Sequence, residues 1–337
     1  MLEGFANEGF TEVWTPVALS REVGKKPYAL TLASERVVLF RDNAGQVAAL
    51  HDQCPHRGVK LSLGKVSKDG CLECPFHGWR FKSDGACKDI PLNPMPEEKR
   101  QRFAATALPV RERGGLIWLY TRPGAEAPDE PLVPTDLEDA GFSNYFYTET
   151  WAAHWTRAME NMLDMPHLPF VHRRTIGGGL WRNMKPDSRM EVEVQPTPVG
   201  LRTTSTLDGK LDDALLEWNR PNNMTLTILD MPGRTLRLRI WCVPVDANHT
   251  RMMLASSRNF MRYNPLAPLF YHFNKVIVGE DRAVVESSHP VEVPQASEER
   301  SVATDRATLA FRRWYLERKK RGERELSAVT EAPPLAS

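Results

Sequence analysis

The chain has 337 residues, which is enough for one large hydrophobic core or two moderate ones. Its 44 Lys and Arg residues nearly balance 43 Asp and Glu residues, so the net charge of +1 gives no electrostatic reason to expect a nucleic acid or an anionic membrane as a partner. No apolar run approaches the roughly 18 residues that span a bilayer, and the first residues lack the basic and then apolar segments of a secretory signal.

Short β-type runs separated by turn residues fill the first third of the chain, a pattern typical of β-hairpins. These runs are residues 28–32, 36–40, 47–51 and 115–120. They predict a small β domain, and the Pro-rich stretch 122–134 that follows has the composition of a linker.

The second part of the chain changes character. Helical spacing appears at 151–164, and segments between 190 and about 260 alternate apolar with polar residues. The alternation predicts an antiparallel sheet with one solvated face. Two further helices are expected near 266–288 and 298–321, and a sheet wrapped around helices would enclose a pocket.

Two short motifs in the first part each combine a cysteine with a histidine. Cys54 and His56 have the spacing C-x-H, and Cys74 and His77 have the spacing C-x-x-H. Two thiolates and two imidazoles suit an asymmetric [2Fe–2S] cluster, with the cysteines on one iron and the histidines on the other. A closed tetrahedral zinc site is the alternative, but zinc knuckles usually keep their cysteines together in one motif.

The full motifs, C-P-H-R-G and C-P-F-H-G-W, resemble those of the Rieske family. The high-potential members of that family carry two further cysteines, in a disulfide, where this chain has Val59 and Phe76. The resemblance therefore implies the lower-potential type of cluster. The other cysteines, Cys71, Cys87 and Cys242, are expected to be ordinary buried thiols. So few cysteines favour a reducing compartment, and we expect a cytoplasmic protein.

A second candidate metal site lies between Asn161 and His172. Asp164 and His167 are three residues apart, which makes them neighbours on a helix. His172 follows five residues after His167, and Pro169 is expected to break the helix and let His172 return to the same point. Two imidazoles and one distant carboxylate would form the facial triad of a non-haem Fe(II) site. Taken alone, histidines in such a segment are more often core or surface residues.

The run N-x-x-D-x-x-H-x-x-x-x-H resembles the iron-binding segment of Rieske non-haem iron oxygenase α-subunits. The resemblance implies that His167 and His172 bind iron and that Asn161 lies near it. It also implies that Asp164 joins a cluster histidine of one subunit to an iron histidine of its neighbour, which requires a head-to-tail ring, usually a homotrimer. The ordinary alternative for Asp164 is a capping or surface carboxylate.

The third iron ligand is ambiguous from the residues alone. Glu280 and Asp281 both fall near a helical face marked by apolar residues, so periodicity does not choose between them. The pattern E-D-x-x-V-x-E resembles the short oxygenases that act as O- or N-demethylases and hydroxylases, where the aspartate binds iron. That resemblance implies Asp281 as the ligand. Glu280 and Glu286 are then solvated helix charges or partners of the ligands.

The resemblance covers nearly the whole chain and implies a terminal oxygenase with a Rieske cluster and a mononuclear Fe(II). No Rossmann or flavin motif is present, so electrons are expected from a separate NAD(P)H-dependent reductase or ferredoxin. The expected reaction uses O₂ to hydroxylate or O-/N-demethylate an aromatic or heterocyclic small molecule. An aromatic cis-dihydroxylating dioxygenase is the enzymatic alternative, and a Rieske electron-transfer protein is the alternative of another class.

These features together predict an α+β fold of two domains. A small β-sandwich-like Rieske domain is expected at 1–125, and a larger catalytic domain at 126–324. The second combines an antiparallel sheet with helices in a helix-grip-like arrangement. Residues 325–337, which contain a Pro-Pro pair, are expected to form a disordered tail.

Overall fold

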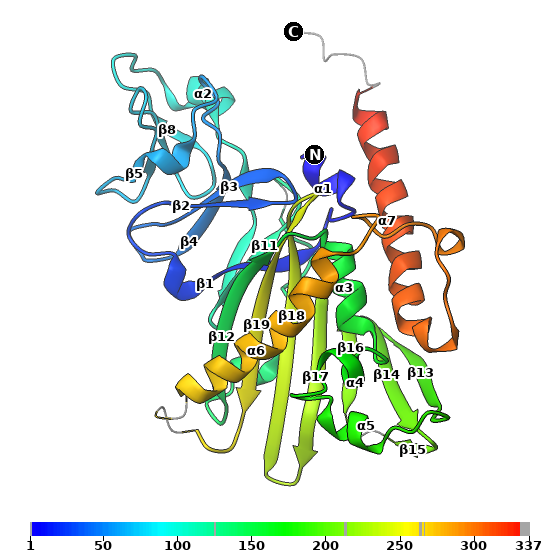
Figure 1. The fold of residues 1–337 in the computed structure, drawn as a ribbon. Helices are drawn as coiled ribbons and strands as arrows, with labels where there is room; N and C mark the ends of the chain where they lie inside the picture. The colour runs from blue at the N-terminus through cyan, green and yellow to red at the C-terminus, as the bar shows by residue number, and fades with distance from the viewer. Residues whose placement is uncertain (1, 125, 212–213, 263–264, 266, 331–337) are drawn as a thin grey trace. The chain divides into compact units, whose positions relative to one another are not determined.

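The computed structural model describes residues 2–124, 126–211, 214–262, 265 and 267–330. The chain divides into two compact units (Figure 1). The first comprises residues up to Pro134 together with the segment from Lys319 onward, and the second comprises Thr135–Arg318. The division therefore falls inside the last helix. The sequence-based domain limits, 1–125 and 126–324, stay predictions.

The first unit is built mainly of short strands. Its elements are α1 (Glu3–Asn7), β1 (Trp14–Leu19), η1 (Ser20–Glu22), β2 (Tyr28–Leu32), β3 (Glu35–Arg41), β4 (Val47–His51), η2 (Leu61–Leu63), β5 (Lys65–Val66), β6 (Leu72–Glu73), β7 (Arg80–Phe81), β8 (Cys87–Asp89), α2 (Glu97–Arg100), η3 (Gln101–Phe103), β9 (Ala107–Leu108), β10 (Val110–Arg113) and β11 (Leu116–Tyr120). The strands predicted near 28–32, 36–40, 47–51 and 115–120 are all present as β2, β3, β4 and β11.

These strands form three antiparallel sheets, ordered β1-β11-β10, β2-β3-β4-β9 and β5-β6-β7-β8. A hydrophobic core that includes Phe40, Leu50, Leu72 and Phe81 also takes in the two motif cysteines. The first motif follows β4, and the second is the connection between β6 and β7. Both candidate ligand loops are thus anchored by strands whose side chains share one core.

The second unit contains a large antiparallel sheet and the longer helices. Its elements are η4 (Thr135–Leu137), β12 (Ser143–Trp151), α3 (Trp155–Leu163), α4 (Leu168–Val171), α5 (Gly178–Asn183), β13 (Met190–Thr197), β14 (Gly200–Leu207), β15 (Lys210–Leu211), β16 (Leu215–Asn219), β17 (Asn223–Met231), β18 (Arg234–Asp246), β19 (His249–Arg258), α6 (Ala267–Glu286), η6 (Ala296–Glu298), η7 (Ala303–Asp305) and α7 (Arg306–Thr330).

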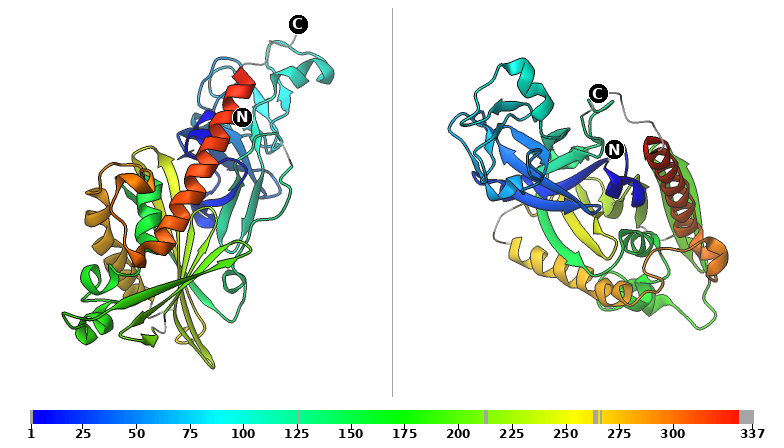
Figure 2. Two further views of the ribbon diagram at one scale, coloured as in Figure 1. Left: turned by 90° about the vertical axis from the view of Figure 1, so that its right-hand side faces the viewer. Right: turned by 90° about the horizontal axis from the view of Figure 1, so that it is seen from above.

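The sheet has eight strands in the order β12-β19-β18-β17-β16-β14-β13, and β15 pairs with β14 at its edge. Alternation along the central strands places large apolar side chains on one face, where Leu226 pairs with both Leu216 and Leu238, and Met224 pairs with Ile240. In the view from above, the strands curve around α3 (Figure 2). The expected α+β architecture, with an antiparallel sheet around helices, is confirmed.

Two local boundaries differ from the sequence-based expectation. Trp151 ends β12, and α3 begins only at Trp155, because the ring of His154 caps the helix by accepting from the Thr156 amide at 3.3 Å. At the other end of the unit, α7 continues to Thr330, past Arg324, since residues 325–330 contain neither Gly nor Pro. Residues 331–337 of the expected tail lie outside the described part of the chain.

None of the helices in the described residues combines the length and the apolar character needed to cross a lipid bilayer.

Candidate metal centres

The two Cys/His loops of the first unit have the same backbone construction. The Cys54 amide donates to the Val59 carbonyl at 2.8 Å, and the Gly58 amide donates to the Cys54 carbonyl at 2.9 Å. In the second loop, the Cys74 amide donates to the Trp79 carbonyl at 2.8 Å, and the Gly78 amide to the Cys74 carbonyl at 3.0 Å. Both glycines have φ +71, a left-handed conformation that glycine adopts without strain.

The loops bring like side chains together. Cys54 and Cys74 are both 2% exposed, and the Nδ1 atoms of His56 and His77 lie 3.1 Å apart. Burial raises the pKa of the Cys54 thiol to about 11, and the neighbouring Cys74 contributes in the same direction. The ring of Trp79 stacks on His56 at 4.5 Å and 5°. A pair of buried thiols and a pair of outer imidazoles therefore occupy two sides of one site.

This pairing matters for the choice between a cluster and a zinc ion. A single tetrahedral ion needs all four ligand atoms around one point. Among the described residues, the one group of three or more His, Cys, Asp or Glu whose ligand atoms lie within 4.8 Å of one another is elsewhere, at His167, His172 and Asp281. The separation of thiols from imidazoles suits a centre with two metal positions.

The segment of the second unit that carries the histidines leaves the helix earlier than predicted. Helix α3 ends at Leu163, and Asp164 already has extended backbone angles. Pro166 explains this end, because a residue before proline is disfavoured in helical conformation. Pro169 lies in the first turn of α4, where proline is tolerated. The expectation that Pro169 breaks the helix is therefore wrong: the chain leaves the helix before His167, and the two histidines flank the short helix α4.

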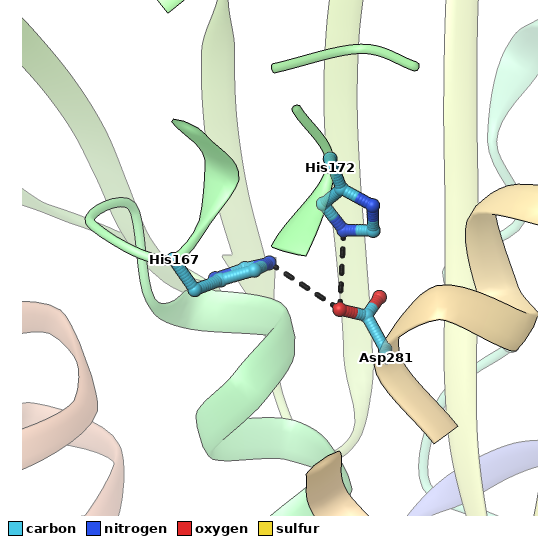
Figure 3. Close-up of side chains that lie close together, drawn as sticks. All are labelled: His167, His172 and Asp281. Carbon is cyan, nitrogen blue, oxygen red and sulfur yellow. Dashed lines mark ion pairs between the residues drawn. The ribbon is translucent and has the colours of Figure 1, made fainter. Parts of the chain in front are cut away.

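His167, His172 and Asp281 converge on one point (Figure 3). The Asp281 Oδ1 atom lies 3.1 Å from His172 Nε2 and 3.5 Å from His167 Nε2. His167 precedes α4, His172 follows it, and Asp281 comes from α6. His172 and Asp281 are buried, at 2% and 3% exposure. The structure thus brings together the three side chains predicted to bind iron.

The donor set suits a divalent metal. The buried Asp281 Oδ1 accepts no aligned hydrogen bond from the described residues, although two imidazole nitrogens face it. An orphaned buried carboxylate oxygen is costly unless a cation or a donor compensates it. Burial lowers the pKa of His172, but the Asp281 and Glu280 carboxylates outweigh this effect and raise it. Two nitrogens and one oxygen match a His₂/carboxylate iron site.

The three other acidic candidates have different surroundings. Glu280 Oε2 lies 2.8 Å from His172 Nδ1, on the side of the ring away from Asp281. Glu286 accepts from the Ala152 amide at 2.8 Å and from Arg282 at 2.8 Å, and is a structural residue. Asp164 Oδ2 lies 3.4 Å from His167 Nδ1, and its side chain is 30% exposed. Asp164 therefore touches a candidate ligand and remains accessible from outside.

A small cavity of about 30 Å³ adjoins the His/His/Asp group. Asp164 also lines it, and the apolar part of its lining comes from α3, α4, the turn after α4, α6 and the central strands: Met162, Leu168, Ile176, Leu216, Met224, Leu226, Leu238, Ile240 and Ile277. Asn161 also lines it, and the buried Nδ2 atom of that residue has no hydrogen-bond partner among the described residues.

A second, wider cavity of about 650 Å³ shares Leu168, Ile176 and Leu226 with the first. Its other lining residues come from α5 and the loop after it, from the β14–β15 edge of the sheet and from β17, and they include Lys185, Asp208 and Lys210. These walls were not predictable from the sequence, because alternating strand residues do not reveal which helix they face. Thr175, which contacts Glu280, also carried no recognisable pattern.

Two family models match the chain. The Rieske [2Fe-2S] domain matches residues 13–102, and the vanillate O-demethylase oxygenase C-terminal domain matches residues 151–320. The second match alone covers about half of the chain, and the two follow each other in the order predicted from the motifs.

Curated proteins with similar sequences include oxygenases of several kinds. Chlorophyllide a oxygenase of Chlamydomonas reinhardtii is 29% identical over 91% of this chain, but the chain spans only 48% of that protein. The phenoxybenzoate dioxygenase α-subunit of Ectopseudomonas oleovorans is 30% identical over 72% of this chain and 63% of that protein. Methylxanthine N1-demethylase NdmA of Pseudomonas putida is 27% identical over 91% of this chain and 88% of that protein. The chain thus spans about half to two thirds of some relatives and most of others.

Solved structures agree with the architecture. NdmA of Pseudomonas putida CBB5 superposes with a TM-score of 0.74 at 25% identity, and the match covers 96% of this chain and 94% of that one. A likeness over both units supports the same succession of a small β unit and a larger sheet-rich unit.

Proposed function

The chain belongs to the oxygenases that carry a Rieske [2Fe-2S] domain and a vanillate O-demethylase-type C-terminal domain, and we propose that it is the terminal component of an oxygenase system. In this proposal it inserts oxygen from O₂ into a small organic substrate, by hydroxylation or O-/N-demethylation. The observation that carries the proposal is the convergence of His167, His172 and Asp281 beside an aliphatic cavity.

Cys54, His56, Cys74 and His77 would hold the [2Fe–2S] cluster, and His167, His172 and Asp281 would hold a mononuclear Fe(II). When bound, these groups supply electron transfer and the activation of dioxygen. The backbone amide pattern of the two loops holds both cysteines in place, and Trp79 fixes the plane of His56 by stacking. A pure electron carrier has no need of a second, buried His/His/Asp group.

The cavity beside His167, His172 and Asp281, called the inner cavity below, determines which part of the substrate is oxidised. Its aliphatic walls exclude water and favour an uncharged, apolar group, such as a methyl-bearing ring, near the three candidate iron ligands. The side-chain amide of Asn161 is available to orient the substrate by a hydrogen bond. Polar groups of the substrate are accommodated in the outer cavity, which lies on the other side of Leu168, Ile176 and Leu226. An aromatic or heterocyclic small molecule suits this division.

Electron supply requires partners. No dinucleotide-binding motif is present in this sequence, so a separate NAD(P)H-dependent reductase or ferredoxin is proposed as the donor. Asp164, with one oxygen toward His167 and the side chain still accessible, has the surroundings expected of a bridge to a cluster histidine of a second copy. This role entails a ring of copies, which we propose to be a head-to-tail homotrimer.

The test begins with metal analysis of anaerobically purified protein. The proposal expects about three irons and about two acid-labile sulfides per chain, with a Rieske-type EPR signal after reduction. Methoxy- and N-methyl-aromatic compounds are then supplied with O₂ and a surrogate reductase. Formaldehyde release supports monooxygenation, whereas a cis-diol product would favour the dioxygenase activity named for the phenoxybenzoate relative. Zinc without sulfide would overturn the proposal.

A further inference from the structure

Two adjacent acidic residues of α6 reach opposite nitrogens of one histidine. Asp281 Oδ1 lies 3.1 Å from His172 Nε2, and Glu280 Oε2 lies 2.8 Å from His172 Nδ1. The ring itself is 2% exposed, so water does not compete for either nitrogen. His172 is therefore held between two carboxylates that follow each other in the sequence.

Glu280 is itself held in place by a second donor. The Thr175 hydroxyl donates to the same Glu280 oxygen at 2.6 Å. Thr175 belongs to a tight turn after His172, in which the amides of Thr175 and Gly177 both donate to the His172 carbonyl, at 2.9 and 3.0 Å. A Cβ at Gly177 would lie 1.9 Å from the Leu168 carbonyl oxygen, so only glycine permits this turn. The carboxylate, the hydroxyl and the imidazole thus form one fixed unit.

We propose that Glu280, supported by Thr175, is the positioning residue for the candidate iron ligand His172, an inference that rests on the proposed iron site. A carboxylate at Nδ1 favours the tautomer with the proton on Nδ1, and this leaves the Nε2 lone pair free toward the metal position. It also orients the ring and strengthens Nε2 as a donor. With Asp281, it brings two negative charges to a site for a divalent cation.

The same geometry argues against Glu280 as a ligand. Both histidines present Nε2 to Asp281, whereas Glu280 contacts the opposite nitrogen of the His172 ring. The three residues whose ligand atoms lie mutually within 4.8 Å do not include Glu280. The two acidic residues that periodicity could not separate therefore have different roles, one toward the metal and one behind the ring.

The experiment measures Fe(II) affinity rather than turnover. The mononuclear site is emptied with a chelator, the cluster is retained as shown by its visible absorbance, and Fe(II) is titrated against a competing chelator. Glu280→Ala should weaken Fe(II) binding by about 10- to 100-fold, the usual effect of losing such a partner. Glu280→Gln, which keeps an acceptor for Nδ1–H but no charge, should lie between Glu280→Ala and the wild type. Thr175→Val should have a smaller effect than Glu280→Ala.

Glu286→Gln is the matched control, because Glu286 lies on the same helix and bonds only to the Ala152 amide and Arg282 among the contacts described. It should leave Fe(II) affinity unchanged. A second readout, the d–d spectrum of Co(II) in the site, should change in Glu280→Ala and recover toward wild type in Glu280→Gln. A general loss of folding would not give this recovery.

Two results would overturn the inference. Wild-type Fe(II) affinity and an unchanged Co(II) spectrum in Glu280→Ala would show that the carboxylate does not position His172. A loss as complete as that in Asp281→Ala, with no recovery in Glu280→Gln, would make Glu280 a ligand instead. If wild-type protein binds no Fe(II) beyond its cluster, the proposed function fails first, and that result is separate because it needs no variant.

Discussion

The two candidate metal centres differ in how the chain builds them. The Cys/His site is made of two loops with matching backbone hydrogen bonds and matching left-handed glycines, and its histidines lie at the outer side. The His/His/Asp site is made of side chains from a bent segment and a distant helix, since His172 and Glu280 are 108 residues apart. Two of its three candidate ligands, His172 and Asp281, are buried, and His172 has a carboxylate on each side of its ring.

This difference has a physical consequence for each site. Local turns shape each loop of the first site, and the core of the first unit brings the two loops together, so its geometry depends on a few backbone conformations and on packing within that unit. The second site exists only when α6 packs against the segment between α3 and α5, so its geometry depends on tertiary structure. The first should therefore respond to changes in turn residues, and the second to changes in side chains that connect α6 with His172.

The strongest test of this comparison is removal of a ligand from the buried site. Asp281→Ala should reduce iron from about three to about two per chain and abolish oxygenation, while sulfide and the cluster absorbance stay unchanged. Iron and sulfide analysis with visible spectroscopy checks this. Loss of the cluster in the same variant would contradict the independence of the two sites. Iron lost from Glu280→Ala but not from Asp281→Ala would make Glu280, and not Asp281, the carboxylate ligand.

The next largest effect is expected at Asp164, which contacts His167 of the His/His/Asp site and is partly exposed to solvent. Asp164→Asn should leave iron and sulfide at wild-type amounts but lower coupled turnover by about 100-fold, because a neutral amide does not hold two imidazole N–H groups as a carboxylate does. Single-turnover kinetics after reduction of the cluster would measure the step directly. Unchanged turnover would remove Asp164 from the electron path.

The two glycine turns of the Cys/His site can be compared with each other. Gly58→Ala and Gly78→Ala should each destabilise cluster binding by about 1–2 kcal/mol, the cost of a left-handed alanine. Gly78→Ala should cost more, because its Cβ would lie 3.2 Å from Pro91 Cγ, whereas the nearest atom at Gly58 is 3.5 Å away. Thermal loss of the visible cluster signal measures both. An equal effect on mononuclear iron would argue against the local character of these loops.

The smallest effect is expected at the wall between the two cavities. Leu226→Phe places a larger side chain in the lining that the two cavities share, and it should raise KM for bulky substrates several-fold, with iron content unchanged. Steady-state kinetics with a small and a bulky methoxy-aromatic compound would separate access from chemistry. A uniform loss of kcat for both compounds would instead indicate that the sheet had shifted the iron ligands.

Prediction from sequence succeeded where function depends on local spacing. The C-x-H and C-x-x-H motifs and the strands beside them needed no long-range information. It was wrong about Pro169, because a proline that ends one helix and a proline that begins the next look alike in a sequence, and here Pro166 follows the end of α3. Thr175 was out of reach, since its hydroxyl matters only through α6, and no spacing connects residues so far apart.

The wall shared by the two cavities has a consequence for changing substrate range. Leu168 directly follows His167, and Ile176 directly follows Thr175, so two of its three members are attached to the metal-holding segment. Leu226 stands on β17, in a sheet held by its own cross-strand pairing. Natural or laboratory evolution that shortens the side chain at Leu226 is therefore expected to alter selectivity at less cost to metal binding than the same change at Leu168 or Ile176. A change at Leu226, on the sheet, should thus alter substrate range without loss of metal. A change at Leu168 or Ile176, in the segment that holds the histidines, should alter both.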